Sequence, residues 1–201
     1  MMTEREFPNW EALYQEQAVE TMPWFNPSLD PDVEEALLTL ELSNGSVLDL
    51  GTGPGTQALA LAERGFQTMG TDLSEAAIRQ AAAKASQKGL EISFQQDDIL
   101  NSCLQQCFDL ILDRGCFHVL PPQSYGTYVQ TVASLLKPKC YLLLKCFSQE
   151  ETREQGPYHF SPEEIGQIFK ERFHLRLAKQ TVYHGILDPL PKALFCILEK
   201  Y

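Results

Sequence analysis

The segment from Val47 to Thr56 constrains the fold of this chain more than any other part of the sequence. It reads Val-Leu-Asp-Leu-Gly-Thr-Gly-Pro-Gly-Thr, an apolar run followed by three glycines at alternate positions. This order predicts a buried strand, a tight turn and the start of a helix, because glycine adopts the positive φ angles that such turns require. The bare backbone of the turn also lets a ligand lie directly against it.

Acidic residues accompany this turn in three places. Asp49 lies just before the first glycine, Asp72 ends a second apolar run, and Asp97 and Asp98 follow a third. A carboxylate at the end of the second strand can accept hydrogen bonds from both hydroxyls of a ribose. The dinucleotide fingerprint G-x-G-x-x-G does not fit, since its sixth position is Thr56, and an acid beside the turn repels a pyrophosphate. The pattern predicts a nucleoside site whose ligand carries an ammonium or sulfonium group.

The stretch Val47–Gly55 matches (V/I)LDxGxGxG, the first motif of the class I S-adenosylmethionine-dependent methyltransferases, and the resemblance extends from about Val47 to Tyr201. It implies S-adenosyl-L-methionine as the cofactor and S-adenosyl-L-homocysteine as the product, with no metal. Asp72 would hold the ribose, and Asp98 matches the acid that reaches the adenine amino group, with Asp97 as the competing assignment. The cofactor-binding residues expected from this resemblance are Trp24, Asp49, Gly51, Thr52, Gly53, Gly55, Asp72, Leu73, Asp97, Asp98, Ile99 and Asp113.

Strand and helix patterns alternate along the chain, which predicts an α/β fold with helices on both faces of a mostly parallel sheet. The expected strands cover residues 46–50, 67–71, 91–95, 108–112, 140–147, 175–183 and 193–199. The expected helices cover residues 10–19, 30–43, 56–63, 74–88, 122–136 and 161–173, with Asn9, Asp30, Ser74 and Ser161 as N-caps.

No helical pattern separates the last two strands, so they predict an antiparallel hairpin. Together with five strands joined by crossovers, this hairpin matches the seven-stranded sheet of the resembled family. The sequence therefore predicts a Rossmann-like three-layer sandwich with a C-terminal antiparallel hairpin. Residues 1–201 are expected to form one domain, in which residues 1–45 are an N-terminal helical cap or lid and residues 46–201 are the core.

Composition excludes several classes of protein. The net charge of −11 and the absence of a basic run argue against a nucleic-acid partner. The apolar runs have the length of strands, which argues against a membrane span, and the first residues lack the pattern of a secretory signal. The six cysteines form no C-x-x-C pair. We therefore expect reduced thiols in a cytoplasmic protein, while the oligomeric state stays open.

Ligands of open α/β sheets bind beyond the carboxyl ends of the strands, and three segments are expected to meet there. They are residues 21–25, 113–118 and 150–160. Residues 113–118 read Asp-Arg-Gly-Cys-Phe-His and resemble a loop found in a subgroup of small methyltransferases. A looser likeness, to the thiopurine- and tellurite-type enzymes that methylate small molecules, rests on the aromatic pattern Trp10, Tyr14, Pro23 and Trp24.

These segments supply the candidate catalytic residues Asp113, His118 and His159, and the candidate substrate contacts Phe25, Arg114 and Tyr158. Each has a structural alternative. Asp113 could cap the following turn, Arg114 could form a salt bridge, and His118 could be a hydrogen-bonded core histidine. Trp24 and Phe25 could pack the N-terminal segment onto the sheet instead of covering the cofactor.

The leading interpretation is a methyltransferase that acts on a small-molecule acceptor such as a thiol or an amine. The alternatives are a methyltransferase of protein side chains, whose basic substrate would face the acidic surface, and a non-catalytic nucleoside-binding module. A nicotinamide oxidoreductase is disfavoured by Asp49 and by the missing sixth glycine. A general base is needed only if the acceptor must lose a proton, and a soft thiol could react without one.

Overall fold

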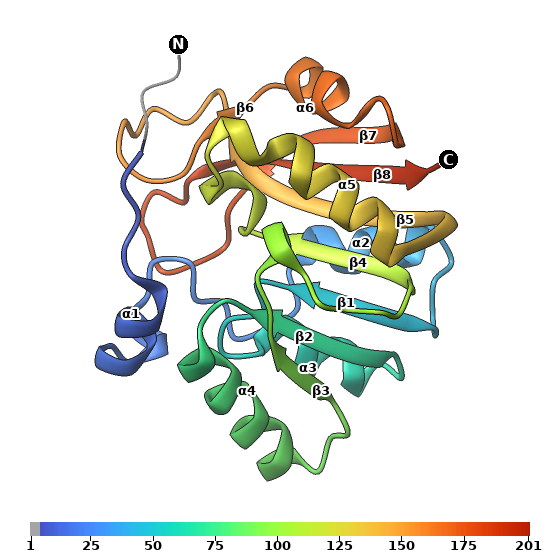
Figure 1. Ribbon diagram of the computed structural model, residues 1–201. Helices are drawn as coiled ribbons and strands as arrows, with labels where there is room; N and C mark the ends of the chain where they lie inside the picture. The colour runs from blue at the N-terminus through green and yellow to red at the C-terminus, as the bar shows by residue number, and fades with distance from the viewer. Residues whose placement is uncertain (1–4) are drawn as a thin grey trace.

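A mostly parallel sheet dominates the computed structural model, which describes residues 5–201 (Figure 1). Its strand order is β3-β2-β1-β4-β5-β8-β7, and a short eighth strand, β6, pairs with β5. The strands are β1 (Ser46–Leu50), β2 (Gln67–Asp72), β3 (Ser93–Gln96), β4 (Phe108–Arg114), β5 (Leu136–Ser148), β6 (His159–Phe160), β7 (Phe173–Val182) and β8 (Lys192–Lys200). Only β8 runs antiparallel to its neighbours, β5 and β7.

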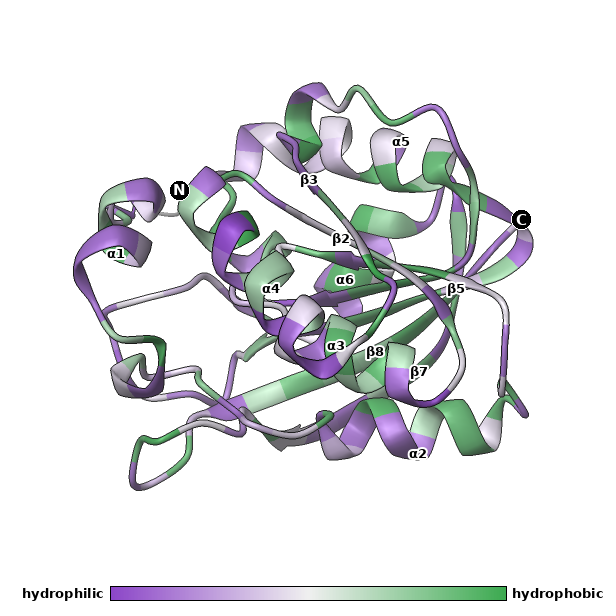
Figure 2. Cartoon of the chain, turned by 90° about the horizontal axis from the view of Figure 1, so that it is seen from below, coloured by the Kyte–Doolittle hydropathy of each residue, from purple (hydrophilic) through white to green (hydrophobic). Residues whose placement is uncertain are grey.

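Helices cover both faces of this sheet, which confirms the predicted Rossmann-like α/β sandwich. The α-helices are α1 (Trp10–Glu16), α2 (Pro31–Thr39), α3 (Thr56–Glu63), α4 (Glu75–Lys88), α5 (Tyr125–Leu135) and α6 (Pro162–Phe169). Helices α5 and α6 pack on one face through one apolar core, and α2 and α3 pack on the other through a second. Figure 2 shows hydrophobic and hydrophilic residues alternating along α2, as one-sided burial requires.

The N-caps follow the sequence signals. Asn9, Asp30 and Ser74 each accept a hydrogen bond from a backbone N–H in the first turn of the following helix, at 3.1 Å in all three cases. Ser161 and Glu164 form a reciprocal capping box at the start of α6. These caps fix where α1, α2, α4 and α6 begin, because they satisfy N–H groups that have no partner within the helix.

Several predicted boundaries were wrong. The first helix ends at Glu16, and Val19–Thr21 forms a separate 3-10 turn. Strand β5 begins at Leu136, earlier than the expected residue 140, because Pro138 stops helix α5 without stopping the extended chain. Helix α6 ends at Phe169, and Phe173 already belongs to β7. The two-residue strand β6 was not predicted, since two residues are too few to show an alternating pattern.

Helix α1 lies beyond the end of the sheet at which the parallel strands terminate (Figure 1). Its residue Glu11 binds the start of α4: the carboxylate accepts from the hydroxyl of Ser74 at 2.7 Å and from the N–H of Ala76 at 3.0 Å. The side chain of Gln80 donates to the carbonyl of Tyr14 at 2.7 Å.

Among the α-helices of residues 5–201, none is both long and apolar enough to cross a membrane.

A buried ion cluster joins the start of α2 to the sheet. Lys145 on β5 is fully buried, and its Nζ lies 2.7 Å from Asp30 Oδ1 and 2.7 Å from Asp32 Oδ2. Arg114, at the end of β4, donates from Nε to Asp30 Oδ2 at 2.8 Å. His184 lies near the same carboxylates, but the ammonium of Lys145 already supplies their cation. This cluster fixes the segment before α2 against the carboxyl ends of β4 and β5.

Removing the lysine of this cluster should destabilise the fold. In Lys145→Met the buried carboxylates lose a cation, and breaking a buried pair in this way costs about 3 kcal/mol. Lys137→Met is the matched control, because Lys137 pairs with Asp109 at the exposed surface and exposed pairs contribute little. Urea unfolding should show a large loss for K145M and a small change for K137M. Equal midpoints for the two variants would contradict the role of the cluster.

Candidate active site

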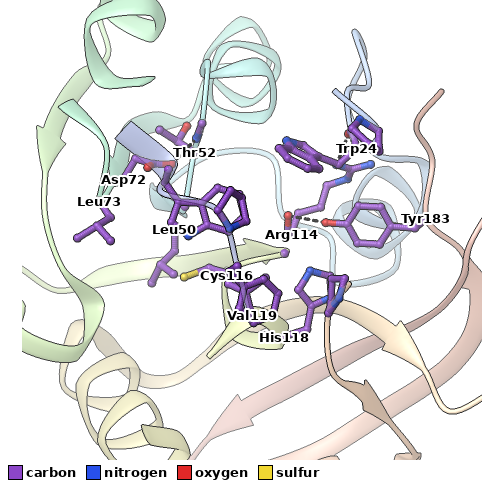
Figure 3. Close-up of a pocket in the computed structure, with 18 of the residues that line it drawn as sticks. Trp24, Leu50, Thr52, Asp72, Leu73, Arg114, Cys116, His118, Val119 and Tyr183 are labelled. Atoms are coloured by element: carbon purple, nitrogen blue, oxygen red, sulfur yellow. Dashed lines mark hydrogen bonds between the residues drawn. The ribbon is translucent and has the colours of Figure 1, made fainter. Parts of the chain in front are cut away.

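A cavity of about 500 Å³ opens at the carboxyl ends of the parallel strands, where strand order reverses between β1 and β4. Its volume suits a small organic ligand. The turn after β1, the ends of β2 and β3, the loop after β4 and helix α1 all contribute to its wall. In Figure 3 Thr52, Asp72 and Leu73 lie on one side, and Trp24, Arg114 and Tyr183 lie on the other.

The glycine turn forms part of the cavity wall through Gly51 and Gly53, whose φ angles are 68° and 53°. A Cβ at Gly51 would lie 2.9 Å from the Cβ of Cys116, and one at Gly53 would lie 2.8 Å from the hydroxyl oxygen of Tyr14. The backbone conformation and the close neighbours therefore both require glycine here. Gly55 does not line the cavity; it caps α3 with a φ of 83° and packs against α4.

Asp49 places a buried carboxylate in the cavity wall at the end of β1. Its Oδ2 accepts from the hydroxyl of Thr52 at 2.6 Å and from the N–H of Ala58 at 3.0 Å. Burial raises the pKa of Asp49 to about 6. Within residues 5–201 no Lys, Arg or His side chain pairs with this carboxylate, so a cationic ligand beside it would satisfy its charge.

Asp72 occupies the matching place at the end of β2. Its Oδ2 accepts from the N–H of Gly53 at 2.8 Å, and its Oδ1 accepts from the N–H of Ser74 at 2.9 Å. A carboxylate offers about four acceptor positions, so two remain for a ligand. Burial raises the pKa of Asp72 as well. The residue couples the glycine turn to the start of α4 while it stays able to bind two ligand hydroxyls.

Asp97 and Asp98 both line the cavity after β3, next to Ile99. Asp97 Oδ1 accepts from the N–H of Cys103 at 2.9 Å, and Asp98 Oδ1 accepts from the N–H of Leu100 at 2.9 Å. Each carboxylate keeps its second oxygen free for a ligand, so the geometry leaves the choice between them open. Leu73 also lines this part of the cavity and is 55% exposed, so it offers apolar surface to a flat ligand.

The other half of the cavity is aromatic, with Trp24, Phe25, Phe147 and Tyr183 in its wall. Arg114 lies here too, and its guanidinium stacks 4.5 Å from the centre of the Tyr183 ring. Besides its ion pair with Asp30, Arg114 donates to the carbonyls of Trp24 and His184. Arg114 therefore forms a salt bridge, which was the structural alternative to contact with a ligand. The same side chain also lines the cavity, so it is still placed to contact a ligand.

His118 lines the same half of the cavity and is buried. Its Nδ1 accepts from the N–H of Phe147 at 3.1 Å, and its ring stacks on that of Tyr183 with a centroid distance of 5.7 Å. Burial, helped by the nearby charge of Arg114, lowers the pKa of His118 to about 3. The ring is therefore neutral across the ordinary pH range.

Besides Gly55, three predicted site residues do not line the cavity. Asp113 is fully buried, and it accepts from three backbone N–H groups of residues 115–117 and from the hydroxyl of Tyr128, at 2.6–3.0 Å. Asp113 therefore caps the turn after β4, which was the structural alternative to a catalytic role. At this position the carboxylate lies next to the N–H groups of the turn and binds them instead of a ligand. Tyr158 is buried and bonded to the N–H of Arg5, and His159 packs against Phe147.

The aromatic wall residues Phe7, Phe147 and Tyr183 were not predicted from the sequence, and the last two lie at strand ends. Phe147 lies near the carboxyl end of β5, and Tyr183 directly follows β7, which runs parallel to β5. Ligands of open α/β sheets bind beyond the carboxyl ends of the strands, and this rule applies to β5 and β7 as it does to β1, β2 and β4. Their position after apolar strand patterns was the signal that could have found them.

Comparison with known proteins agrees with this geometry. The family model described as "Methyltransferase domain" matches residues 47–139. An uncharacterized methyltransferase of Schizosaccharomyces pombe is 32% identical over 115 residues, covering 56% of this chain and 79% of that protein. The 2-heptyl-1-hydroxyquinolin-4(1H)-one methyltransferase of Mycobacteroides abscessus is 29% identical over 175 residues, covering 83% of this chain and 77% of that protein.

Solved structures show the same fold. A protein described under the conversion of a disulfide bond into a thioacetal group in echinomycin biosynthesis has a TM-score of 0.82, with 23% identity over 95% of this chain and 91% of that one. An S-adenosylmethionine-dependent methyltransferase of Methanosarcina mazei has a TM-score of 0.72, with 21% identity over 86% and 98% of the two chains. With the glycine turn and its carboxylates, these similarities show that the chain belongs to the class I S-adenosylmethionine-dependent methyltransferases.

Proposed function

We propose that this methyltransferase transfers the methyl group of S-adenosyl-L-methionine to a small-molecule acceptor such as a thiol or an amine. The observation that carries the proposal is one cavity with two chemically different halves. One half holds Asp49 and Asp72, buried carboxylates without a cation partner among residues 5–201, and the other is walled by aromatic rings. A cationic nucleoside suits the first half, and an apolar or aromatic acceptor suits the second.

The cofactor residues proposed from the motif, apart from Gly55, fit this cavity. Asp72 has two acceptor positions left for the ribose hydroxyls. Gly51 and Gly53 give bare backbone for the methionine portion, and the negative charge of Asp49 complements its cationic groups. The adenine would lie against Leu73 and Ile99, with Asp97 or Asp98 at its amino group. Thr52, Trp24 and Asp113 were also assigned to this site; the first two line the cavity, and Asp113 shapes its turn.

When bound, the cofactor supplies a methyl group on a sulfonium, which is already a good leaving group. The protein therefore has to bind both partners, align them and exclude water. Helix α1 and Trp24, both from the N-terminal segment, form part of the cavity wall. Arg114 fixes the backbone of Trp24 by donating to its carbonyl. Holding two reactants in line can lower a barrier by about 7–11 kcal/mol.

A small acceptor is favoured over a protein side chain because the acceptor half lies in the same cavity as the cofactor half and is lined by large rings. The Mycobacteroides abscessus relative, by its name, methylates an aromatic small molecule. A protein substrate would instead need an open groove for its backbone on both sides of the methylated residue. The non-catalytic alternative has no observation in its favour, since both halves of the cavity are present.

Changing the proposed ribose ligand should weaken cofactor binding. In Asp72→Asn the charged acceptor is lost, and a charged hydrogen bond of this kind corresponds to about a ten- to hundredfold change in affinity. Asp109→Asn makes the same chemical change at the opposite end of the sheet, where Asp109 binds Ser46 and Lys137. Calorimetry with S-adenosyl-L-homocysteine should show the loss in D72N and near-normal affinity in D109N. Equal affinities of D72N and D109N for S-adenosyl-L-homocysteine would contradict the assignment of Asp72 to the ribose.

The class of acceptor can be tested directly. The protein is incubated with S-adenosyl-L-methionine labelled in its methyl group and with a cell extract split into a small-molecule and a protein fraction. We expect label in the small-molecule fraction only, because the acceptor half of the cavity is walled by rings. Label confined to the protein fraction would establish the protein-directed alternative. Tight cofactor binding with no label in either fraction would favour a non-catalytic module.

A further inference from the structure

The ring of His118 is held on several sides. The N–H of Phe147 donates to Nδ1, the ring of Tyr183 stacks on one face, and the ring of Phe147 meets it nearly at a right angle, with centroids 5.2 Å apart. The carbonyl of His118 also accepts from the N–H of Tyr158 at 2.8 Å. These contacts leave the imidazole little freedom to rotate.

The hydrogen bond from Phe147 decides where the imidazole carries its proton. A backbone N–H can only donate, so Nδ1 of His118 must present its lone pair. In a neutral ring the proton then resides on Nε2, and this nitrogen is a donor. No side-chain or backbone group within residues 5–201 accepts from Nε2, while the ring itself borders the cavity. The free hydrogen-bonding function of His118 is therefore one N–H donor.

A donor cannot act as a general base, so the candidate role of His118 as the base does not fit this hydrogen bond. Asp113 and His159, the other two candidates, do not line the cavity. The cavity-lining titratable groups outside the four aspartates are Glu6, Tyr14, Arg114, Cys116, His118, Arg153 and Tyr183. Glu6 is exposed to solvent, the arginines are cations, and burial raises the pKa of the tyrosines and of Cys116. None of the buried groups among them is ready to take a proton at neutral pH.

Charge is distributed unevenly between the two halves of the cavity. The four aspartates lie at the ends of β1, β2 and β3, whereas Arg114 lies at the end of β4 and His118 in the loop after it; Arg153 and the exposed Glu6 also contribute to the wall. The charge of Arg114 is shared with Asp30 and that of Arg153 with Glu151, so the Nε2 donor is the polar group of the aromatic half that is free to bind an acceptor. Such a half favours an acceptor that is aromatic and carries negative charge on the atom to be methylated.

We propose that His118 acts as a hydrogen-bond donor to an acceptor that binds already ionised, such as an aromatic thiolate or the oxyanion of an acidic aromatic hydroxyl. This proposal rests on the proposed methyltransferase function and names its acceptor class. The anionic heteroatom forms a bond to the methyl carbon while the carbon–sulfur bond of the sulfonium breaks. Sulfur keeps the electron pair, both products are neutral at the reacting atoms, and no proton is transferred.

The tautomer of His118 can be measured without cofactor or turnover. Histidine-selective ¹⁵N labelling and long-range ¹H–¹⁵N correlation identify which ring nitrogen carries the proton, and the resonance that disappears in His118→Phe gives the assignment. We expect the proton on Nε2 at neutral pH. A proton on Nδ1 would overturn the proposal whatever the enzyme methylates. Failure of the protein to bind S-adenosyl-L-homocysteine would instead overturn the proposed function.

Binding of two aromatic thiols tests the acceptor class. The probes are 4-nitrothiophenol, which is ionised at neutral pH, and phenylmethanethiol, which is mostly neutral; each is titrated into protein saturated with S-adenosyl-L-homocysteine. We expect the ionised probe to bind more tightly, and H118F to weaken it by about ten- to a hundredfold. His118→Gln should restore most of that loss, because its carbonyl can accept from Phe147 while its amide donates to the probe.

Thermal unfolding and affinity for S-adenosyl-L-homocysteine establish that H118F and H118Q are folded before the thiols are compared. Tighter binding of the neutral thiol by the wild type would contradict the proposal. So would a wild-type affinity of H118F for the ionised thiol, or an equal loss in H118F and H118Q. If H118F does not fold, the ring resonance that disappears in H118Q gives the same assignment, so the tautomer of the wild type can still be measured.

Discussion

The buried carboxylate of Asp49 is the constraint on which the site depends. It lies at the end of β1 and binds the hydroxyl of Thr52 and the N–H of Ala58, so it fixes the glycine turn between the strand and helix α3. Burying a charge without a cation is costly, and that cost appears as a pKa raised to about 6. A cationic ligand in the cavity lowers this cost, which links the stability of the turn to the ligand that it binds.

The rest of the fold brings a second surface to this turn. The ion cluster of Asp30, Asp32, Lys145 and Arg114 fixes the segment that precedes α2, and Arg114 extends from it to the backbone of Trp24. Helix α1 is bound separately, through Glu11 at the start of α4. The aromatic half of the cavity is thus assembled from distant parts of the chain by buried charges and caps, while the acidic half comes from consecutive strand ends.

Sequence patterns predicted the strand-end residues of the acidic half, but only part of the aromatic half, namely Trp24, Phe25, Arg114 and His118. The glycine turn and Asp72 directly follow or end apolar runs, and Asp49 lies within one, so local order alone places them near strand ends. Tyr183 and Phe147 carry no such motif, and their role depends on the pairing of β5, β8 and β7. The roles of Asp113 and His118 depend on hydrogen bonds that spacing in the sequence does not reveal. The carboxylate of Asp113 accepts from the N–H groups of the loop that follows it, and the imidazole of His118 accepts from a backbone N–H of β5.

The central claim is that the turn at residues 51–55 and the carboxylates of Asp49 and Asp72 hold the adenosyl cofactor. A crystal structure of the protein with S-adenosyl-L-homocysteine tests it most directly. The account predicts density in the cavity with both ribose hydroxyls within hydrogen-bond distance of Asp72 and the homocysteine portion against Gly51 and Gly53. Density at another place, or a ribose that does not contact Asp72, would contradict it.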